Sequence, residues 1–398
     1  MAESKIVLAF SGGLDTSFCL VWLREEKGAE VIPVTVDTGG FSAVERKSIE
    51  KRSHELGGRN FQWMDGRKEL FDRFLTYLIY GNCLKGGVYP YSVSAERTLQ
   101  AEKVVGVARR EGALAVAHGS TGAGNDQVRF DGIIRTVAPA LEIITPVRDL
   151  KISRDEEIQY LRRKGYAVNS KRKEFSINRG MWGATFGNRE LQNVRSGKAF
   201  GVLYSGNPAA KGRRNFAVAF EKGVPVAFNG KKMEGHTLVE TLNRQGAPWN
   251  IGFGLHTGTT ALGIKGRIAF QAPAAWLLIR AHQELEKVVL TRDELFWKGV
   301  LGEVYGDFLH RGLYLHPLER EIEAFLKQSQ ERVTGKVSGF LVPGEVFVTA
   351  VDSPFSLFDA GRATYGEGAS WGPEEVKGFI KFHHLETALA AGKGGGRS

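Results

Sequence analysis

Apolar and polar positions alternate in blocks along the first 165 residues of the chain. Residues 5–10 (Lys-Ile-Val-Leu-Ala-Phe) form a short apolar run, and a glycine-rich loop joins it to a helical pattern that extends to about residue 25. An uninterrupted apolar run of this length is typical of a buried parallel strand. Further strands are predicted at 31–36, 61–63, 114–117 and 142–146, and further helices at 43–56, 102–110 and 154–164. This order predicts an α/β domain with a doubly wound parallel sheet over residues 1–168.

The pattern changes beyond about residue 170, where glycines become frequent and the turn Asn229-Gly230 appears. Strands, amphipathic helices and a final hairpin are predicted in mixed order, at 216–220, 224–228, 274–288, 317–330 and 335–351. These elements predict an α+β domain over residues 169–370. The C-terminal segment, residues 371–398, is predicted to contain a helix within 373–390 and a flexible tail after Gly392.

The amino-acid composition limits the classes of protein to which the chain can belong. The chain has 398 residues, of which 42% are hydrophobic, and this is enough for two domain cores. Only two cysteines occur, Cys19 and Cys83, which excludes a disulfide framework or a cysteine metal site. The N-terminus lacks the pattern of a signal peptide, and no window approaches the roughly 18–20 apolar residues of a membrane span. We therefore expect a soluble cytoplasmic protein that makes no use of a membrane.

The net charge of +10 is the unusual bulk property. It is compatible with nucleic acid, a membrane surface or small anionic ligands as partners. The basic clusters Arg162-Arg163-Lys164 and Lys171-Arg172-Lys173 are the best candidates for a nucleic-acid surface. Neither is interleaved with aromatic residues or accompanied by an RNA-binding motif, so we interpret both as solvated surface. The expected partners are small molecules and not nucleic acid.

The loop Ser11-Gly12-Gly13-Leu14-Asp15-Thr16-Ser17 follows the first predicted strand and opens a helix. Phosphate oxygens need several backbone N–H groups at short range, and Gly12 and Gly13 allow this approach because they lack Cβ atoms. The hydroxyls of Ser11, Thr16 and Ser17 and the helix N-terminus add favourable interactions. The Gly-Lys-Ser/Thr ending of a Walker A loop is missing. The sequence therefore predicts a different pyrophosphate-binding loop, in which Asp15 orients Mg²⁺ or the loop itself; the alternative is a tight turn capped by Asp15.

A second glycine-rich stretch runs from His118 to Phe130 (His-Gly-Ser-Thr-Gly-Ala-Gly-Asn-Asp-Gln-Val-Arg-Phe). It directly follows a predicted strand, so it is expected at the carboxyl edge of the sheet, where open α/β sheets bind ligands. Asp126 is suited to an ammonium group and Arg129 to a carboxylate. Thr121 and Asn125 are suited to the polar atoms of an amino acid. The alternative is an elaborate loop without a ligand.

These residues resemble two nested families. Residues 10–17 resemble the Ser-Gly-Gly-x-Asp-Ser/Thr signature of the PP-loop ATP pyrophosphatases, which cleave ATP between the α and β phosphates. Nearly the whole chain resembles the argininosuccinate synthase family. The collinear segments are Phe10 to Ser17, Asp37 to Gly40, His118 to Phe130, Gly263 to Arg267, Ser329 to Val337 and Glu375 to Lys381.

The resemblance implies a ligase that uses MgATP, with a synthetase domain and a C-terminal oligomerisation helix following the nucleotide-binding domain. Citrulline is adenylated, pyrophosphate leaves, and aspartate displaces AMP to give argininosuccinate in arginine biosynthesis. Positioning would carry much of the catalysis, since it can supply roughly 7–11 kcal/mol of a barrier. The family is homotetrameric, with C-terminal helices exchanged between subunits, and it binds Mg²⁺ through the ATP phosphates and not at a protein metal site.

The resemblance also assigns roles to residues. ATP is expected to contact Ala9, Phe10, Ser11, Gly12, Gly13, Leu14, Asp15, Thr16, Ser17, Val36 and Gly119. Aspartate is expected to contact Thr121, Asn125 and Asp126. Citrulline is expected to contact Tyr89, Ser94, Asn125, Arg129, Ser176 and Thr185, with Arg97 also in the substrate site. Asp15, Asp126 and Arg129 are the expected catalytic residues.

Three departures from the family concern the citrulline half of this site. Gly258 stands where the family has an acidic citrulline contact, and Phe270 stands where it has a tyrosine. The run Asn178-Arg179-Gly180-Met181 replaces Asp-Glu-Asn-Leu. A charge-assisted hydrogen bond of the lost kind contributes roughly 1.5–3 kcal/mol. These changes indicate weaker citrulline binding or a substrate whose amino end is altered.

Three alternative functions remain open at this point. One is a related ligase that joins aspartate to a different ureido compound. Another is a PP-loop tRNA-modifying enzyme, which the basic charge would suit. The last is a binding scaffold that retains the nucleotide loop without catalysis.

Overall fold

The computed structural model describes residues 4–122, 124–168, 175–204, 210–358 and 371–393. It divides the chain into one compact unit from residue 1 to 353 and a second from 354 to 398. Three sequence features lie outside the described residues: Ala123 of the second glycine-rich stretch, the basic cluster at 171–173 and the predicted domain boundary at 168/169. That boundary stays a prediction.

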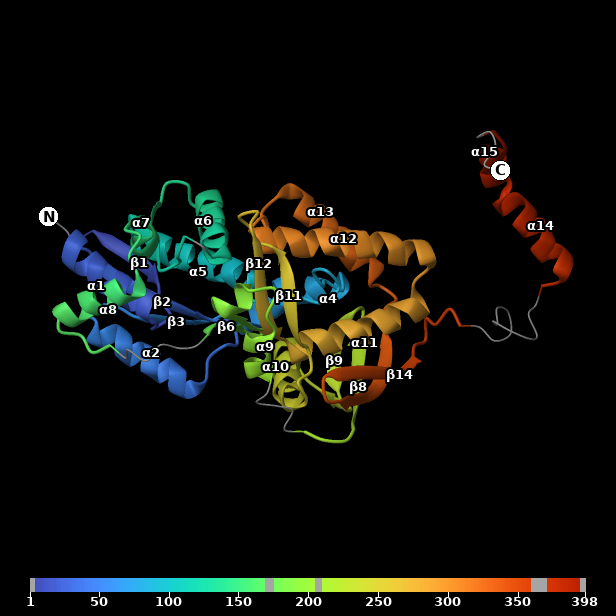
Figure 1. Ribbon diagram of the computed structural model, residues 1–398, viewed down its shortest axis with the longest axis horizontal. Coiled ribbons are helices and arrows are strands. Elements are labelled where there is room, and N and C mark those ends of the chain that lie inside the picture. Colours follow the sequence, from blue (N-terminus) through green and yellow to red (C-terminus); the bar gives the residue numbers. More distant parts are fainter. Residues whose placement is uncertain (1–3, 123, 169–174, 205–209, 359–370, 394–398) are drawn as a thin grey trace. The chain divides into compact units, whose positions relative to one another are not determined.

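A parallel five-stranded sheet forms the N-terminal part of the first unit (Figure 1). Its strands are β1 (Lys5–Ala9), β2 (Glu30–Asp37), β3 (Gln62–Asp65), β4 (Ala115–His118) and β5 (Glu142–Ile144). Their order across the sheet is β3-β2-β1-β4-β5, and every pair of neighbours is parallel. This arrangement confirms the α/β class predicted from the alternation of strands and helices.

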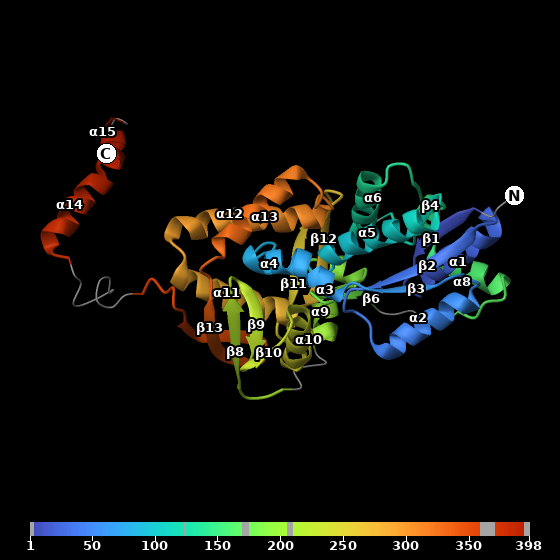
Figure 2. The same ribbon diagram turned by 180° about the vertical axis from the view of Figure 1, so that it is seen from behind.

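Helices cover both faces of this sheet (Figures 1 and 2). Ile6 and Leu8 of β1 belong to a core formed with α1 (Leu14–Lys27), whereas Val7 belongs to the core on the opposite face, with α5 (Ser94–Glu111). Side chains alternate between faces along a strand, so a short apolar run with buried neighbours on both sides serves two cores. The first core also receives side chains from α2 (Ala43–Glu55), α7 (Pro146–Asp149) and α8 (Arg154–Arg163), and the second from α6 (Asn125–Val137).

Several predicted boundaries need correction. Helix α5 begins at Ser94 and not at residue 102, directly after Val93, which has a positive φ of 69°. Strand β5 ends at Ile144, because Pro146 occupies the first turn of α7, where its missing N–H is tolerated. The capping box at the start of α8 is confirmed, since the side chains and backbone N–H groups of Ser153 and Glu156 bond reciprocally.

Two antiparallel sheets build the rest of the first unit. One has the order β10-β9-β8-β13-β14, with β8 (Arg214–Glu221), β9 (Val224–Phe228), β10 (Lys231–Lys232), β13 (Gly335–Val342) and β14 (Glu345–Asp352). The other has the order β11-β12-β7-β6, with β6 (Ser176–Gly180), β7 (Gly183–Gly187), β11 (Phe253–Thr259) and β12 (Lys265–Gln271). The predicted hairpin at 335–351 is therefore confirmed as β13–β14.

The same part of the chain contains long helices. They are α10 (Gly235–Gly246), α11 (Pro273–Val289), α12 (Arg292–Arg311) and α13 (Pro317–Ser329), and α11 contacts β8, β13 and β14. Shorter helical segments are α3 (Arg67–Leu70), the π-helix η1 (Phe71–Leu75), α4 (Thr76–Tyr80), α9 (Lys198–Tyr204) and the 3₁₀ turns η2 (Glu190–Gln192) and η3 (Ala247–Trp249). In the described part of the chain, no helix combines the length and apolar character needed to cross a membrane.

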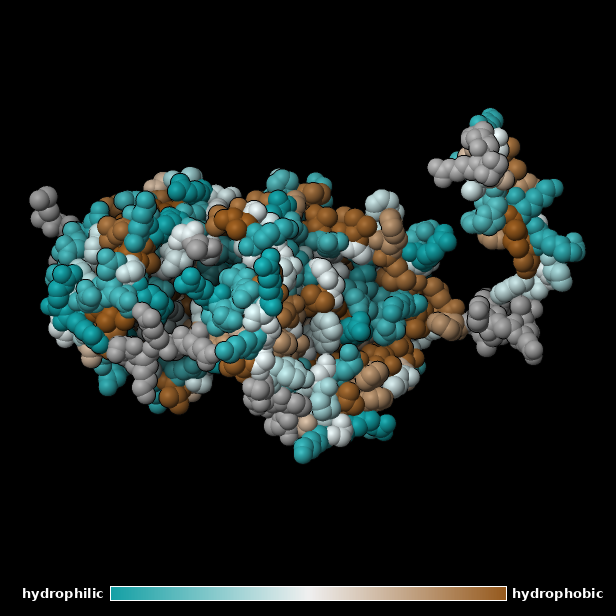
Figure 3. Space-filling model, in the orientation of Figure 1, coloured by the Kyte–Doolittle hydropathy of each residue, from teal (hydrophilic) through white to brown (hydrophobic). Residues whose placement is uncertain are grey.

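The second unit contains two helices, α14 (Pro373–His383) and α15 (Leu385–Lys393). The single helix predicted within 373–390 is thus divided at His384. None of the described residues in these two helices is buried. Hydrophobic side chains instead form an exposed stripe along α14, visible in brown in Figure 3.

A buried ion pair connects the helices of the C-terminal half. The ammonium of Lys298 on α12 lies 2.8 Å from Glu286 Oε2 on α11 and donates to the carbonyl of Tyr80 at 2.7 Å. Asn82 and Gln330 donate to the two oxygens of the same carboxylate, at 2.6 and 2.9 Å. Both charged side chains are almost fully buried, so the loss of hydration of each charge is compensated by the opposite charge of the other.

Replacing Lys298 by methionine is expected to destabilise the fold by about 3–5 kcal/mol, because Glu286 would keep a buried charge without its cation. The measurement is urea unfolding followed by circular dichroism. The matched control is Lys287→Met, since Lys287 is exposed and pairs with Glu284 at the surface, where such pairs contribute about 0–1 kcal/mol. Equal unfolding midpoints for the two variants would contradict this account.

Candidate active site

The two glycine-rich stretches meet at the point where the strand order reverses. Strands β1 and β4 are neighbours, with Ala9 opposite His118 at their carboxyl ends. The chain leaves β1 toward β2 on one side and later returns to β4 on the other, so the loops after these strands diverge around a crevice. A Cβ atom at Gly119 would lie 3.2 Å from Thr16 N and from the carbonyl carbon of Asp15. The second stretch therefore approaches the first loop at the backbone itself.

The first loop has the conformation that phosphate binding requires. Gly12 has a φ of +72°, a region that favours glycine. Ser11 and Thr16 are hydrogen-bonded across the loop, with 3.2 Å between their hydroxyl oxygens and 3.3 Å from Ser11 N to Thr16 Oγ1. Helix α1 starts at Leu14 with Gly13 as its N-cap, and glycine has no side chain with which to cap it. The first-turn N–H groups and the positive end of the helix dipole thus face the loop.

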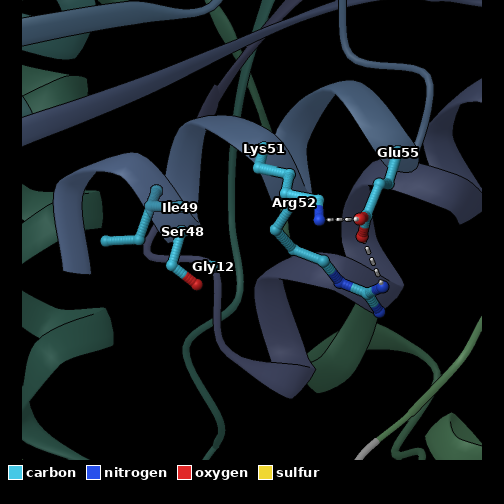
Figure 4. Close-up of a pocket in the computed structure, with 6 residues that line it drawn as sticks. All are labelled: Gly12, Ser48, Ile49, Lys51, Arg52 and Glu55. Atoms are coloured by element: carbon cyan, nitrogen blue, oxygen red, sulfur yellow. Dashed lines mark ion pairs between the residues drawn. The ribbon is translucent and has the colours of Figure 1, made fainter. Parts of the chain in front are cut away.

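A hollow of about 300 Å³ opens beside Gly12, lined by α2 (Figure 4). Its lining residues are Gly12, Ser48, Ile49, Lys51, Arg52 and Glu55. Glu55 lies 3.8 Å from the Lys51 ammonium and 3.6 Å from the Arg52 guanidinium. Arg52 also reaches Ser17 at the start of α1, with 3.5 Å between Nε and Oγ. This places basic side chains next to the predicted pyrophosphate loop.

Asp15 is paired with a second carboxyl group that the sequence did not single out. Glu157 on α8 is buried, and its carboxyl group interacts electrostatically with that of Asp15. Burial, and then the charge of Asp15, raise the pKa of Glu157 well above its usual range. Arg154 Nη1 lies 3.8 Å from Asp15 Oδ1. A protonated Glu157 therefore helps to fix Asp15 within the loop.

The second stretch leads into α6, whose first two turns carry Asn125, Asp126 and Arg129. Asp126 bonds to two cations: Oδ2 lies 2.9 Å from Arg97 Nε, and Oδ1 lies 3.3 Å from Arg129 Nη1. Burial alone would raise the pKa of the Asp126 carboxyl, but these guanidinium groups outweigh it and hold the pKa below its usual range. Asp126 is therefore a carboxylate at neutral pH.

A network of hydrogen-bonded side chains stabilises the second glycine-rich stretch. His118 Nε2 lies 2.8 Å from Asp131 Oδ1, and Arg148 Nη1 lies 3.1 Å from Asp131 Oδ2. Gln127 donates to the carbonyls of Gly122 and Gly124, at 2.5 and 3.2 Å. The described part of the loop is thereby held by the first turns of the helix that follows it. Asp131 and Arg148 were missed by the sequence analysis.

The predicted citrulline residues come from several separate elements. Tyr89, in the segment before α5, and Ser94, the first residue of α5, are both buried, and the Tyr89 hydroxyl donates to the carbonyl of Ser92 at 2.6 Å. Thr185 on β7 lies opposite Phe270 on β12, and the Phe270 ring centroid is 5.3 Å from that of Tyr89. The structure thus brings Tyr89, Phe270 and Thr185 into one region.

Strand β11 completes this region. Gly258 lies opposite Gly266 in the β11–β12 pair. Just beyond the strand, Ala261 N donates to Asn125 Oδ1 at 2.9 Å. Asn125, assigned to both substrates, therefore links the second stretch to the acceptor region. Ser176 lies on the exposed edge strand β6, and none of its described contacts joins it to Tyr89 or Gly258.

The remaining predicted residues lie as follows. Phe10 is buried and its N–H donates to the carbonyl of Val34 at 2.8 Å, while Val36 lies two residues further along β2. Thr121 lies exposed in the second stretch. The segment Asp37 to Gly40 contacts β6 and the turn after it, since Met181 N donates to the carbonyl of Thr38 at 2.7 Å.

The residues of β6 that differ from the family pattern lie against specific residues of α5. Asn178 accepts a hydrogen bond from Arg97 Nη2 at 3.1 Å, so it adds to the cluster around Asp126. A Cβ atom at Gly180 would overlap the carboxyl of Glu96, a residue that is fully buried in α5. Burial raises the pKa of Glu96 to about 6. Because glycine has no Cβ atom, Gly180 leaves room for the buried carboxyl group of Glu96.

Among the described residues, no group of three or more His, Cys, Asp or Glu side chains is placed to hold a metal ion. A Mg²⁺ ion often binds through one or two carboxylates and the phosphates of its substrate. Asp15 is the carboxylate within the phosphate loop itself. The residues present are thus compatible with Mg²⁺ carried by a nucleotide, with Asp15 as its protein neighbour.

The Asp15–Glu157 pair predicts a pH dependence of stability. A carboxyl whose pKa rises on folding binds its proton more tightly in the folded state, so stability falls as pH rises from its ordinary pKa through the folded value. Glu157→Gln cannot ionise, so its melting temperature is expected to fall less than that of the wild type between pH 5 and pH 8. Thermal unfolding at the two pH values measures this. The control is Glu50→Gln, at an exposed position on α2; equal pH slopes for Glu157→Gln and the wild type would contradict the assignment.

Comparison with known proteins gives matches along almost the entire chain. The family described as "Arginosuccinate synthase N-terminal HUP domain" matches residues 5–167, and "Arginosuccinate synthase C-terminal domain" matches residues 175–390. The argininosuccinate synthase of Methanocaldococcus jannaschii is 38% identical over 389 residues, covering 97% of this chain and 98% of its own length. That of Dictyoglomus turgidum is 37% identical over 396 residues, covering 99% of both chains. That of Pyrobaculum aerophilum is 38% identical over 394 residues, covering 98% of this chain and 99% of its own. The loop geometry at the switch point and these full-length matches agree: the chain belongs to the argininosuccinate synthase family.

Proposed function

We propose that this protein is an AMP-forming ligase that joins citrulline to aspartate, using ATP, and so makes argininosuccinate for arginine biosynthesis. The observation that carries the proposal is the contact between the phosphate-type loop at Gly12 and the Asp126-bearing stretch, which meet through Gly119. One loop suits a polyphosphate and the other suits an amino acid. The full-length similarity to argininosuccinate synthases supports the same reaction.

The reaction has two steps with a defined balance of atoms. The ureido oxygen of citrulline attacks the α-phosphorus of ATP, and the bond to the β-phosphate oxygen breaks, releasing pyrophosphate. The aspartate amine then attacks the ureido carbon, the carbon–oxygen bond breaks, and AMP leaves with the former ureido oxygen. The enzyme has to neutralise the leaving pyrophosphate and keep water from the adenylate.

The residues divide between these tasks. The backbone from Ser11 to Thr16 and the N-terminus of α1 would hold the departing pyrophosphate, with Mg²⁺ bound by its phosphates beside Asp15. The Asp126 carboxylate would bind the ammonium of aspartate, in exchange for part of its present pairing with Arg97 and Arg129. The released guanidinium groups would then be available to substrate carboxylates. Orientation of the two substrates is the main catalytic contribution in this arrangement.

The alternatives fit less well. A tRNA-modifying enzyme or a binding scaffold would not be expected to match argininosuccinate synthases over 97–99% of the chain. A cytoplasmic location, where ATP is available, stays a prediction.

The activity is tested by pyrophosphate release with ATP, citrulline and aspartate. Release that requires citrulline is expected in the wild type. Asp126→Asn should lower kcat/KM for aspartate by roughly 10- to 150-fold, because it removes a charge-assisted hydrogen bond of about 1.5–3 kcal/mol. Asp293→Asn is the control, since Asp293 is a highly exposed carboxylate on α12. Pyrophosphate release that is independent of any acceptor, or an unchanged kcat/KM for aspartate in Asp126→Asn, would contradict the proposal.

We further propose that four chains assemble through the C-terminal helices. Large apolar side chains are exposed on α14 and α15 (Figure 3): Val376, Phe379, Ile380, Phe382, Leu385 and Leu389. Phe379 and Ile380 have exposed fractions of 65% and 51%. A contiguous apolar stripe of this kind is typical of a protein–protein contact.

Phe379→Asp combined with Ile380→Asp is expected to dissociate the tetramer, because charges would enter the apolar stripe. Light scattering coupled to size-exclusion chromatography gives the mass directly. Lys377→Ala, at an exposed position on the same helix that pairs with Glu374, should leave the mass unchanged. A wild-type protein with the mass of one chain at micromolar concentration would rule out this assembly.

A further inference from the structure

The C-terminus of α12 lies against α6 at Arg129. Helix α12 ends with Gly312 as its C-cap, at a positive φ of 76°. A Cβ atom at Gly312 would lie 3.1 Å from the Cα atom of Arg129. Glycine suits this position in two ways, because it adopts the left-handed conformation that ends the helix and allows the close approach to α6. The last turn of α12, which contains His310, is thereby held beside the Arg129 side chain.

His310 contacts the guanidinium of Arg129 at two points. Its backbone carbonyl accepts a hydrogen bond from Arg129 Nε at 3.0 Å, and its ring atom Nδ1 lies 3.1 Å from Arg129 Nη2. Nε and Nη2 lie on the same edge of the rigid, planar guanidinium, so the two contacts together fix the rotation of that plane. The carbonyl belongs to the last turn of the helix, where carbonyl groups lack intrahelical partners and the helix dipole is negative. This end of α12 therefore favours a cation.

The imidazole of His310 is the acceptor in its contact with Arg129. A guanidinium has only donors, so Nδ1 must present a lone pair and the ring proton must be on Nε2. Burial, followed by the charge of Arg129, lowers the pKa of His310 to about 3, which keeps the ring neutral at the pH of an enzyme assay. Tyr91 packs against the ring in an edge-to-face contact, with centroids 6.0 Å apart. Packing and hydrogen bonding thus hold the imidazole in one orientation.

The remaining terminal nitrogen of Arg129 is directed toward Asp126. Nη1 lies 3.3 Å from Asp126 Oδ1, which makes this the longest of the three contacts. In the proposed reaction the ammonium of aspartate takes over part of this pairing. Both contacts with His310 remain when the Nη1 contact is lost, so the guanidinium keeps its orientation and presents Nη1 to a substrate carboxylate. Such an arrangement prepares the cation before the substrate arrives.

We propose that His310 is a positioning residue of this ligase, which holds the Arg129 guanidinium in the orientation that suits a substrate carboxylate. The inference rests on the proposed function and adds to it a residue that acts through Arg129. It requires the ring of His310 to be a hydrogen-bond acceptor. A purely structural role would require only a ring that packs against Tyr91.

The test separates these two roles by the kinetics of the full-length protein. Pyrophosphate release is measured while the concentrations of citrulline, to which Arg129 is assigned, and of ATP are varied in turn. His310→Phe keeps a packed ring but removes the acceptor, so kcat/KM for citrulline should fall roughly tenfold or more, the effect of one hydrogen bond to a charged group, while the KM for ATP is unchanged. His310→Asn should recover most of this loss, because its side-chain oxygen lies the same number of bonds from the backbone as Nδ1.

His54→Phe is the matched control, since it makes the same substitution at an exposed position on α2. It should keep the wild-type kinetics, and melting temperatures establish that each variant is folded. A folded His310→Phe with the wild-type kcat/KM for citrulline, a parallel rise in its KM for ATP, or a His310→Asn as impaired as His310→Phe overturns the inference and leaves the ligase activity standing. A wild type that releases no pyrophosphate with citrulline overturns the proposed activity as well.

Discussion

The site depends on a close approach of two backbones at the switch point of the parallel sheet. Gly119 lies so near to Asp15 and Thr16 that a Cβ atom there would be 3.2 Å from backbone atoms of the first loop. Backbone cannot move aside as a long side chain can, so a larger residue would force the two loops apart. The phosphate loop and the Asp126-bearing stretch can lie within one site because this contact is possible. The order β2-β1-β4 brings the two strands together, and glycine lets their loops touch.

Charge then separates the site into regions with different ligands. The N-terminus of α1 and the nearby Arg52 favour the phosphate end. Asp126 stays ionised between two guanidinium groups, which makes it a carboxylate that a substrate ammonium can engage in exchange for existing bonds. A substrate is therefore oriented by where its charges are tolerated, and this orientation is what a reaction controlled by positioning requires.

Local sequence patterns predicted much of the fold but little of the antiparallel part around the acceptor. The apolar runs of β1 and β2 and the capping box at Ser153 depend on near neighbours, and their positions were nearly right. Strands β6, β7 and β11 contain glycine and polar residues and are stabilised by pairing with distant segments, so no period reveals them. The start of α5 was placed too late because its first turn carries Ser94 and Glu96, which are buried despite being polar. In the site, the glycine motifs indicated both loops, whereas Glu157 could be recognised only when the fold placed it beside Asp15.

The central claim is that the two loops act on a single acceptor, which is adenylated on its ureido oxygen and from which the aspartate amine then displaces AMP. The most direct measurement uses an acceptor labelled with ¹⁸O in the ureido group, followed by mass spectrometry of the products after complete turnover. Because the carbon–oxygen bond breaks in the second step, this account predicts one ¹⁸O atom in each AMP and none in pyrophosphate. Unlabelled AMP, or label in pyrophosphate, would contradict it.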